Sequence, residues 1–225
     1  MSVLILMRHG QASFGETHYD TLSTLGRQQA RATGHWLRER AETLTSIRHG
    51  PRARQVDTAG LVVEAADLGL SLERVTGLDE FAEGEEVLAA AAALFGRPMS
   101  GPEAPARREQ LRCYEAAYEA WSRGELDIPG RASYGEFRSD VRQWLRDVVA
   151  VPAAPSGQRI LAVTSAGVIA AAVCDVLDLP DVQWCALVRV INNASTTEIV
   201  FSQGRVALRT FNSAAHLAPE LTSPI

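Results

Sequence analysis

The fold of this chain is decided by one stretch near its start, Val3-Leu4-Ile5-Leu6-Met7-Arg8-His9-Gly10. Its first five residues are apolar without polar alternation, which is typical of a strand buried on both faces within a parallel sheet. A cation, an imidazole and a glycine follow directly. Because ligands of open α/β sheets bind at the carboxyl ends of the strands, we predict an α/β protein whose reactive groups lie there.

Arg8 and His9 suit the chemistry of phosphate esters. A guanidinium can hold two oxygens of an anion in a planar fork, and a neutral imidazole has a ring nitrogen that can attack phosphorus. The alternative interpretation is structural, with a salt-bridged arginine and a buried, hydrogen-bonded histidine at a strand end. Three residues alone do not separate these interpretations, because short motifs often match by chance.

A second predicted strand, Leu44 to Ile47, also runs into cationic residues. The run Arg48-His49-Gly50-Pro51-Arg52-Ala53-Arg54 follows it and opens a helix predicted from Ala53 to about Ala66. The free amides and the dipole at a helix N-terminus attract anions, and arginines strengthen such a site. Two strand ends carrying arginine fit one phosphate pocket better than two unrelated exposed turns.

Two more strand ends carry candidate site residues. A strand predicted at Ile160 to Val163 is followed by Thr164-Ser165-Ala166-Gly167 and a helix to Leu177, again a phosphate-binding geometry. A third strand, predicted at Val75 to Leu78, precedes Asp79 and Glu80. A carboxylic acid near two arginines can act as a general acid if burial raises its pKa.

The remaining pattern predicts helices and further strands. We expect helices from Ser23 or Thr24 to about Arg40, from Val87 to about Arg123 with a break at Arg97 to Pro105, and from Ser133, where Glu136 completes a capping box. The predicted inward faces are Leu22, Leu25, Ala32, Trp36 and Leu37 in the first of these helices, and Phe137, Val141, Trp144, Leu145 and Val148 in the last. Further strands are predicted at Leu187 to Ile191, Thr196 to Phe201 and Val206 to Phe211, with a linker at Pro152 to Gly157 and a hairpin at Ser202-Gln203-Gly204.

Composition narrows the class of protein. With 225 residues, 46% of them hydrophobic, the chain is long enough for one α/β domain with a large core. The net charge of −5 implies no attraction to nucleic acid or acidic membranes. All 22 basic residues are arginine, which excludes a Walker lysine and a Schiff-base lysine. Three scattered cysteines (Cys113, Cys174 and Cys185) form neither a disulfide framework nor a zinc motif.

Several motifs along the chain resemble those of the histidine phosphatase superfamily, in its phosphoglycerate-mutase-like branch. Arg8-His9-Gly10 follows the first strand, and Asp20 to Ala30 is similar to the family's D-x-L-T-x-x-G-x-x-Q-A helix start. Arg54 to Ala59 resembles its second arginine motif, and Leu78-Asp79-Glu80-Phe81 its acid motif. Further similarity lies at Gly157 to Ile169 and at Asn212 to Leu217. The motifs occur in the family's order over nearly the whole chain.

The resemblance implies a fold and a domain organisation. We expect an α/β fold, a three-layer α/β/α sandwich with a mostly parallel central sheet and one antiparallel strand, as in phosphoglycerate mutase. The whole chain, residues 1–225, should form a single domain with a helical cap inserted at about 84–130. Arg107, Arg108 and Arg112 in that segment are expected to form a solvated helix face, with a clamp for a distal phosphate as the alternative.

The resemblance also implies an activity. We expect a metal-independent phosphatase that hydrolyses a phosphomonoester through a phosphohistidine at His9, with Glu80 as general acid. Arg8, Arg54, Ser165 and Ala166 are the expected phosphate-binding residues, and no metal or other cofactor is expected. The alternatives are a phosphoglycerate-type mutase and a catalytically degenerate phosphate-binding or interaction module.

One position departs from the family pattern. Ser165 stands where the family usually has a second catalytic histidine, so we expect a weakened phosphatase, in which Ser165→His raises the rate if the ring has room. A pocket rebuilt around the serine is the alternative. Arg54 rather than Arg52 is expected to line the phosphate pocket, and Asp79 and Glu83 are expected to be solvated, as are Glu85 and Glu86. His49, Arg52 and His216 are interpreted as structural or surface residues.

The expected partners follow from the same features. A small phosphorylated substrate or a phosphoprotein is expected, with no nucleic acid and no membrane, and a homodimer is left open. The apolar run from Val3 to Met7 lacks a basic leader and is too short for a signal peptide, so we expect a cytoplasmic protein. The arginine- and alanine-rich composition suggests a bacterial source.

Overall fold

The computed structural model of the chain describes residues 1–13, 20–150, 157–202 and 205–223, and one six-stranded sheet forms its centre. The order of the strands is β3-β2-β4-β1-β5-β6. β3, β2, β4 and β1 are parallel, whereas β5 is antiparallel to both of its neighbours. The strands are β1 (Ser2–Arg8), β2 (Ser46–His49), β3 (Leu72–Arg74), β4 (Arg159–Thr164), β5 (Thr196–Ser202) and β6 (Arg205–Ser213).

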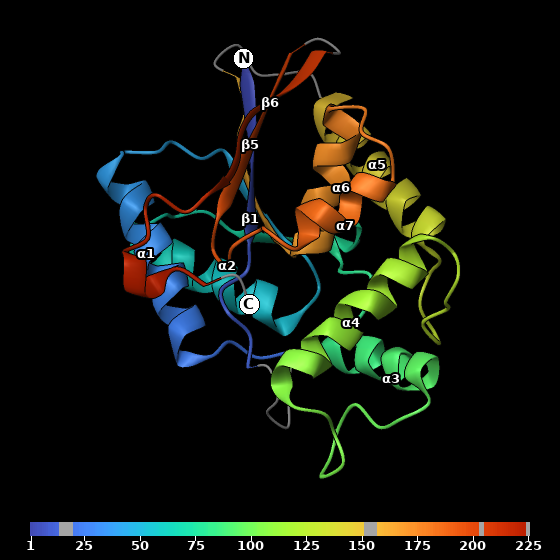
Figure 1. Cartoon of the computed structure of the whole chain (residues 1–225). Helices are drawn as coiled ribbons and strands as arrows, with labels where there is room; N and C mark the ends of the chain where they lie inside the picture. Colours follow the sequence, from blue (N-terminus) through green and yellow to red (C-terminus); the bar gives the residue numbers. More distant parts are fainter. Residues whose placement is uncertain (14–19, 151–156, 203–204, 224–225) are drawn as a thin grey trace.

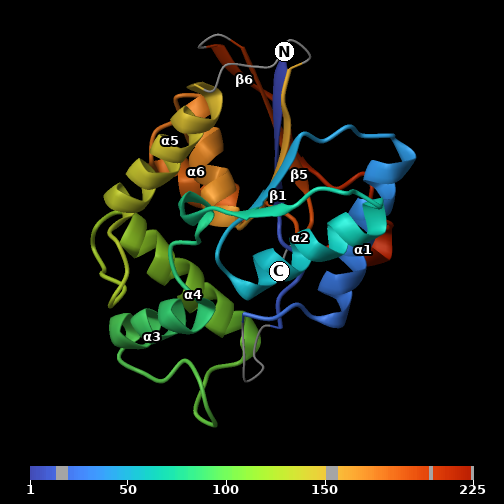
Figure 2. The same ribbon diagram turned by 180° about the vertical axis from the view of Figure 1, so that it is seen from behind.

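Helices cover both faces of this sheet. Side chains of β1 alternate between two cores, with Leu4 and Leu6 on one face and Val3, Ile5 and Met7 on the other. The helices α1 (Thr24–Glu39) and α2 (Ala53–Ala66) lie on the second face, and α5 (Tyr134–Ala150) and α6 (Ala166–Val176) on the first (Figures 1 and 2). The predicted three-layer sandwich with a mostly parallel sheet and one antiparallel strand is confirmed.

Three more helices complete the described fold. α3 (Gly84–Phe95) packs on α4 (Arg107–Ser122), and both lie beyond the carboxyl ends of the parallel strands (Figure 1). The short helix α7 (Val182–Val188) contacts α4 and α6. α3 and α4 fall within the range predicted for a cap, about 84–130, and the cap itself stays a prediction.

Two predicted strands were wrong. Val75 to Leu78 does not form a strand: Thr76–Leu78 is a 3₁₀ turn that buries Leu78 in the core, and the neighbouring strand β3 ends at Arg74. The segment from Leu187 to Ile191 is the end of α7 and the turn after it. Both errors have one cause, because a segment of four or five residues with apolar residues at both ends suits a strand and a helical turn equally. The strand predicted at Leu44 to Ile47 is β2, two residues further along.

The helix predictions were more accurate. Ser23 caps α1, where its hydroxyl accepts a hydrogen bond from the amide of Gly26, and Ser133 and Glu136 form the predicted capping box of α5. All five predicted inward residues of α5 are buried. The predicted face of α1 was partly wrong, since Leu25, Ala32 and Trp36 are only half-buried. The residues of α1 that are buried are Gly26, Gln29, Ala30, Thr33, Gly34 and Leu37.

Two predicted connections fall on residues outside the described ones. Most of the linker at Pro152 to Gly157 and the tip of the hairpin at Gln203 and Gly204 belong to them. Among the described residues, no helix combines the length and apolar character that a membrane span requires.

Candidate active site

His9 lies directly after β1, at the carboxyl edge of the sheet. Its amide donates to the carbonyl of Thr164 on β4 at 2.8 Å, and its side chain is buried. The ring nitrogen Nδ1 is 2.7 Å from the carbonyl oxygen of Gly10. A carbonyl oxygen can only accept, so Nδ1 carries the proton in this contact, and the lone pair of the neutral ring is on Nε2.

Two arginines keep this imidazole neutral. The Nε–H of Arg54 donates to His9 Nε2 at 3.2 Å. Burial, followed by the positive charges of Arg54 and Arg8, holds the pKa of His9 well below its ordinary value of 6.5. At neutral pH the histidine therefore offers an unprotonated nitrogen beside two cations.

Arg54 is held in place by two carboxylates. It is buried at the start of α2, and its Nη1 donates to Asp20 Oδ1 at 2.8 Å and to Glu83 Oε2 at 2.7 Å. Asp20 also accepts from the backbone amides of Ala53 and Arg54, which ties it to the N-terminus of α2. The guanidinium is thus fixed before any substrate binds.

Arg8 is positioned by the far end of the chain. Its Nη1 donates to the carbonyl oxygen of Ile191, which follows α7, and the backbone amide of Arg8 donates to Ser195. The position of this guanidinium therefore depends on the connection between α7 and β5.

The pKa of Glu80 is shifted in the direction expected of a general acid. Its oxygens accept from the amides of Phe81 at 3.0 Å and Gly167 at 3.3 Å. Burial raises the pKa of Glu80, and the two amides and Arg54 only partly oppose this rise. A Cβ at Gly167 would lie 2.2 Å from Glu80 Oε1. The start of α6 therefore comes so close to the carboxyl group that only glycine fits at position 167.

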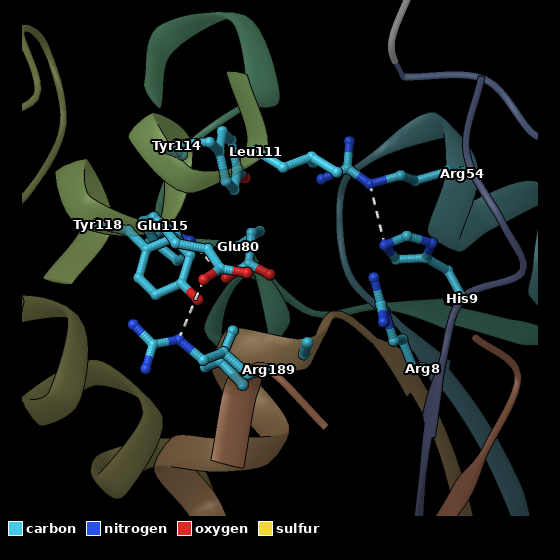
Figure 3. A pocket seen from close by; sticks show the side chains of 13 residues that line it. Arg8, His9, Arg54, Glu80, Leu111, Tyr114, Glu115, Tyr118 and Arg189 are labelled. Atoms are coloured by element: carbon cyan, nitrogen blue, oxygen red, sulfur yellow. Dashed lines mark hydrogen bonds and ion pairs between the residues drawn. The ribbon is translucent and has the colours of Figure 1, made fainter. Parts of the chain in front are cut away.

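One cavity of about 90 Å³ brings most of the predicted site residues together. Arg8, His9, Arg54, Glu80 and Ala166 all line it, and they come from β1, α2, the loop before α3, and α6 (Figure 3). The structure therefore gathers five of the six residues predicted for the site. Their roles in catalysis and phosphate binding stay predictions.

Ser165 is the exception. It is buried at the N-terminus of α6 and does not line this cavity. Its Oγ accepts a hydrogen bond from Gln55 Nε2 at 2.8 Å, and the same amide donates to the carbonyl of Leu78. The predicted contact between Ser165 and phosphate stays a prediction.

The acidic residues near Glu80 were expected to be solvated, but three of them form ion pairs, and Glu83 is the one that is largely buried. Arg52 donates to Asp79 and Glu83 in two short contacts, and Glu83 also binds Arg54. Glu86 forms a two-pronged ion pair with Arg131. The prediction failed for Glu83 because it treated the run as one exposed turn, whereas Glu83, at the start of α3, pairs with both Arg52 and Arg54. Glu85 alone of the four is exposed, as predicted.

The other candidate histidines and arginines lie elsewhere. His49 is buried with Nδ1 2.7 Å from the carbonyl of Gly50, and it does not line the cavity. His216 stacks on Trp36 of α1. Arg108 and Arg112 line a different groove, beside Phe95. No group of three or more His, Cys, Asp or Glu side chains among the described residues could hold a metal ion.

Sequence reasoning missed the far wall of the cavity. This wall is formed by α4 and by the end of α7, opposite His9 (Figure 3). Its residues are Leu111, Tyr114, Glu115, Tyr118, Val188 and Arg189. The first four follow the spacing i, i+3, i+4 and i+7, so the pattern of one helix face was present in the sequence. The family resemblance predicted a cap in this segment, but nothing in the sequence indicated which of its residues face the end of the first strand.

The family profile of the histidine phosphatase superfamily (branch 1) matches residues 4–89 and 99–214. This match covers nearly the whole chain and includes Arg8, His9, Arg54, Glu80 and Ser165. The chain belongs to the histidine phosphatase superfamily. The resemblance drawn from the sequence motifs is thereby confirmed, and this superfamily member is an enzyme of the histidine-phosphatase type.

Solved structures agree with this membership. A mycobacterial glucosyl-3-phosphoglycerate phosphatase is similar with 25% identity and a TM-score of 0.67, over 95% of this chain and 99% of the other. A phosphoserine phosphatase variant from Entamoeba histolytica, in complex with phosphoserine, is 21% identical, with a TM-score of 0.66 over 97% and 100% of the two chains. A putative alpha-ribazole-5′-P phosphatase from Escherichia coli is 18% identical, with a TM-score of 0.66 over 94% and 96%.

The last two structures support only the shared fold, because their sequence identity to this chain is low. No curated protein matches this histidine phosphatase superfamily member significantly in sequence.

Proposed function

We propose that this protein is a metal-independent phosphatase that hydrolyses a small phosphomonoester through a phosphohistidine at His9. One observation carries the proposal: His9 is neutral, with its lone pair on Nε2, beside two fixed arginines in a cavity that also holds Glu80, a carboxyl group whose pKa is raised by burial. Groups whose pKa values are displaced in opposite directions are typical of an acid and a nucleophile sharing one site.

The first half of the reaction breaks the ester bond. Nε2 of His9 attacks phosphorus, forming the N–P bond as the P–O bond to the alcohol breaks. Arg8 and Arg54 stabilise the charge on the phosphoryl oxygens, and Glu80 gives its proton to the departing alkoxide. The Nδ1–H bond to Gly10 supports the positive ring that forms.

The second half regenerates the enzyme. Glu80 is then a carboxylate and takes a proton from water, whose oxygen attacks phosphorus as the N–P bond breaks. Inorganic phosphate leaves, and His9 and Glu80 return to their starting protonation states.

The size of the cavity supports a small substrate. Its volume is about 90 Å³, and α4 and α7 close the side opposite His9. The mycobacterial relative acts on glucosyl-3-phosphoglycerate, which is also a small phosphorylated molecule. We therefore favour a phosphorylated metabolite over a phosphoprotein.

Trapping the intermediate tests the proposal. Wild-type enzyme, mixed with a ³²P-labelled ester in EDTA and quenched in alkali, should carry an acid-labile label, and His9→Ala should carry none. The matched control is His49→Ala, which removes a buried histidine with the same bond to the next carbonyl but outside the cavity. Label retained in His9→Ala, or activity lost in EDTA, would contradict the mechanism. Transfer of the label to a second hydroxyl would indicate a mutase, and binding without turnover a degenerate module.

A further inference from the structure

The wall of the cavity opposite His9 has a chemical character of its own. One face of α4 supplies Leu111, Tyr114, Glu115 and Tyr118, and Arg189 follows α7 (Figure 3). The rings of Tyr114 and Tyr118 meet edge to face at 5.7 Å. Aromatic and aliphatic side chains therefore offer an apolar surface to the part of a substrate that does not carry the phosphate.

Arg189, the cation of this wall, is already neutralised by carboxylates. Its Nη2 donates to Glu119 Oε2 at 2.8 Å, its Nε lies 3.5 Å from Glu115 Oε2, and it also bonds the hydroxyl of Tyr118. A carboxylate on a substrate would have to displace one of these partners. A substrate carboxylate would therefore compete with Glu119 for this guanidinium, and the charge of Glu115 beside it would oppose its approach.

Glu115 remains the group that a ligand can use. Its contact with Arg189, at 3.5 Å, is longer than a normal hydrogen bond, whereas Glu119 has the shorter contact. Glu115 also lines the cavity. It can accept hydrogen bonds from a hydroxyl or an ammonium group and repels a carboxylate.

The other end of the cavity has the opposite charge. Arg8 and Arg54 both lie beside His9, where a phosphate would bind. The cavity is therefore polarised, with two cations at the phosphate end and, at the other end, an aromatic wall that bears the Glu115 carboxylate and the carboxylate-paired Arg189.

We propose that this site selects phosphomonoesters whose alcohol half is neutral or cationic and has an apolar face, and that it disfavours a second anionic group there. The inference rests on the proposed function in that a phosphate occupies the end lined by Arg8 and Arg54. Glu115 is the residue that sets the charge preference, and Arg189 limits it.

Three phenyl phosphates of matched shape test this preference. They carry an aminomethyl, a hydroxymethyl or a carboxyl group at the 4-position, and their binding to His9→Ala is measured by calorimetry, so that no turnover is needed. We expect the aminomethyl ester to bind about 5- to 10-fold more tightly than the carboxyl ester, with the hydroxymethyl ester between them. Equal affinities, the reverse order or no binding would overturn the inference.

Two variants in the His9→Ala background should change the preference in opposite directions. Glu115→Gln should remove most of the preference for the aminomethyl ester over the carboxyl ester. Arg189→Gln should increase this preference, because the Glu115 carboxylate then has no cation beside it. Glu109→Gln is the matched control, since Glu109 is an exposed residue of the same helix that pairs with Arg97 in another groove. A preference that survives Glu115→Gln would also overturn the inference.

Turnover of the same three esters by the wild-type enzyme separates this inference from the proposed function. Binding in the expected order without hydrolysis would refute the phosphatase and leave the charge preference standing. Hydrolysis of all three esters, with equal affinities, would support the phosphatase and refute the charge preference.

Discussion

The pKa values of two side chains in the site are shifted from their ordinary values in opposite directions. The pKa of His9 is lowered by burial and by Arg54 and Arg8, and that of Glu80 is raised by burial. The neutral histidine and the protonated acid coexist at pH values between the two pKa values if the histidine titrates below the acid. The rate should then rise with pH as His9 loses its proton, below pH 6.5, and fall as Glu80 loses its proton, above pH 4.5.

Replacing Glu80 by glutamine should affect one class of substrate most. An alkyl phosphate needs a proton on its leaving oxygen, and 4-nitrophenyl phosphate hardly does, so Glu80→Gln should slow the alkyl ester by about 10²- to 10⁴-fold and the aryl ester far less. The falling limb of the pH profile should disappear. Measuring kcat/KM against pH for both esters checks this, and equal slowing of the two would remove the assigned role.

Arg54 and Arg52 are two residues apart and face different partners. Arg54 lines the cavity and contacts His9, whereas Arg52 holds Asp79, Glu83 and the carbonyl of Glu80. Arg54→Ala should therefore weaken vanadate binding by about 2–5 kcal/mol, and Arg52→Ala should weaken it much less. Competition of vanadate with an aryl phosphate measures both, and equal losses would contradict the distinction.

Gln55 limits which side chains fit at position 165. Its amide bonds Ser165 in a fully buried contact, so an imidazole at position 165 must occupy space that Gln55 now fills. We expect Ser165→Ala to slow the enzyme less than about tenfold, since a neutral hydrogen bond is lost. Ser165→His alone should give no gain, and Ser165→His with Gln55→Ser should be faster than Gln55→Ser alone. A severe loss in Ser165→Ala would indicate a pocket rebuilt around the serine.

At this scale the sequence predicted which residues meet but not how they are held. Arg8 and His9 stand at the end of β1, and Arg54 and Ala166 open helices, and the topology of a parallel sheet brings such positions together. Glu80 reaches the same edge after a 3₁₀ turn, not after the strand that was predicted. The partners of Arg54 could not be predicted, because Asp20 and Glu83 reach it from loops whose paths no local pattern specifies. The contact between Gln55 and Ser165 depends likewise on how the N-terminal ends of α2 and α6, on opposite faces of the sheet, meet at its edge.

Among the elements, α1 and α2 pack closely because of a single glycine. A Cβ at Gly34 of α1 would lie 2.6 Å from both Ala65 Cβ and the carbonyl oxygen of Val62 on α2. Long elements of this kind, with a capping residue and a periodic pattern, were predicted well. The failures were short segments, Val75 to Leu78 and Leu187 to Ile191, whose form depends on what they pack against.

Two glycine substitutions in this helix pair should have opposite effects. Gly34→Ala should lower the free energy of unfolding by about 1–3 kcal/mol, because the helices must move apart. Gly60→Ala on α2 should raise it by about 0.5–1 kcal/mol, since nothing lies within 4 Å of the added Cβ and alanine is the better helix former. Urea unfolding of both variants checks this, and destabilisation by Gly60→Ala would contradict the reasoning.

For the whole molecule, the three-layer arrangement follows from the alternation of β1. Five apolar residues that feed two cores require helices on both faces, so the sequence predicted the layers correctly. The sequence did not predict that a segment near the C-terminus closes the fold against α1. There, the hydroxyl oxygen Oγ1 of Thr33 lies 3.0 Å from His216 Nε2. The rings of Trp36 and His216 stack with their centroids 4.8 Å apart.

This closure should make the whole fold sensitive to acid. Burial lowers the pKa of His216 from 6.5 to about 4, so the unfolded chain binds this proton at a higher pH than the folded one. The stabilisation is complete above pH 6.5 and is lost as the pH falls towards 4, by about 2–3 kcal/mol in total. His216→Gln removes the titration, so its free energy of unfolding should fall less than that of the wild type between pH 7 and pH 4. Urea unfolding at both pH values measures the difference, and parallel losses in the two proteins would show that His216 does not carry this dependence.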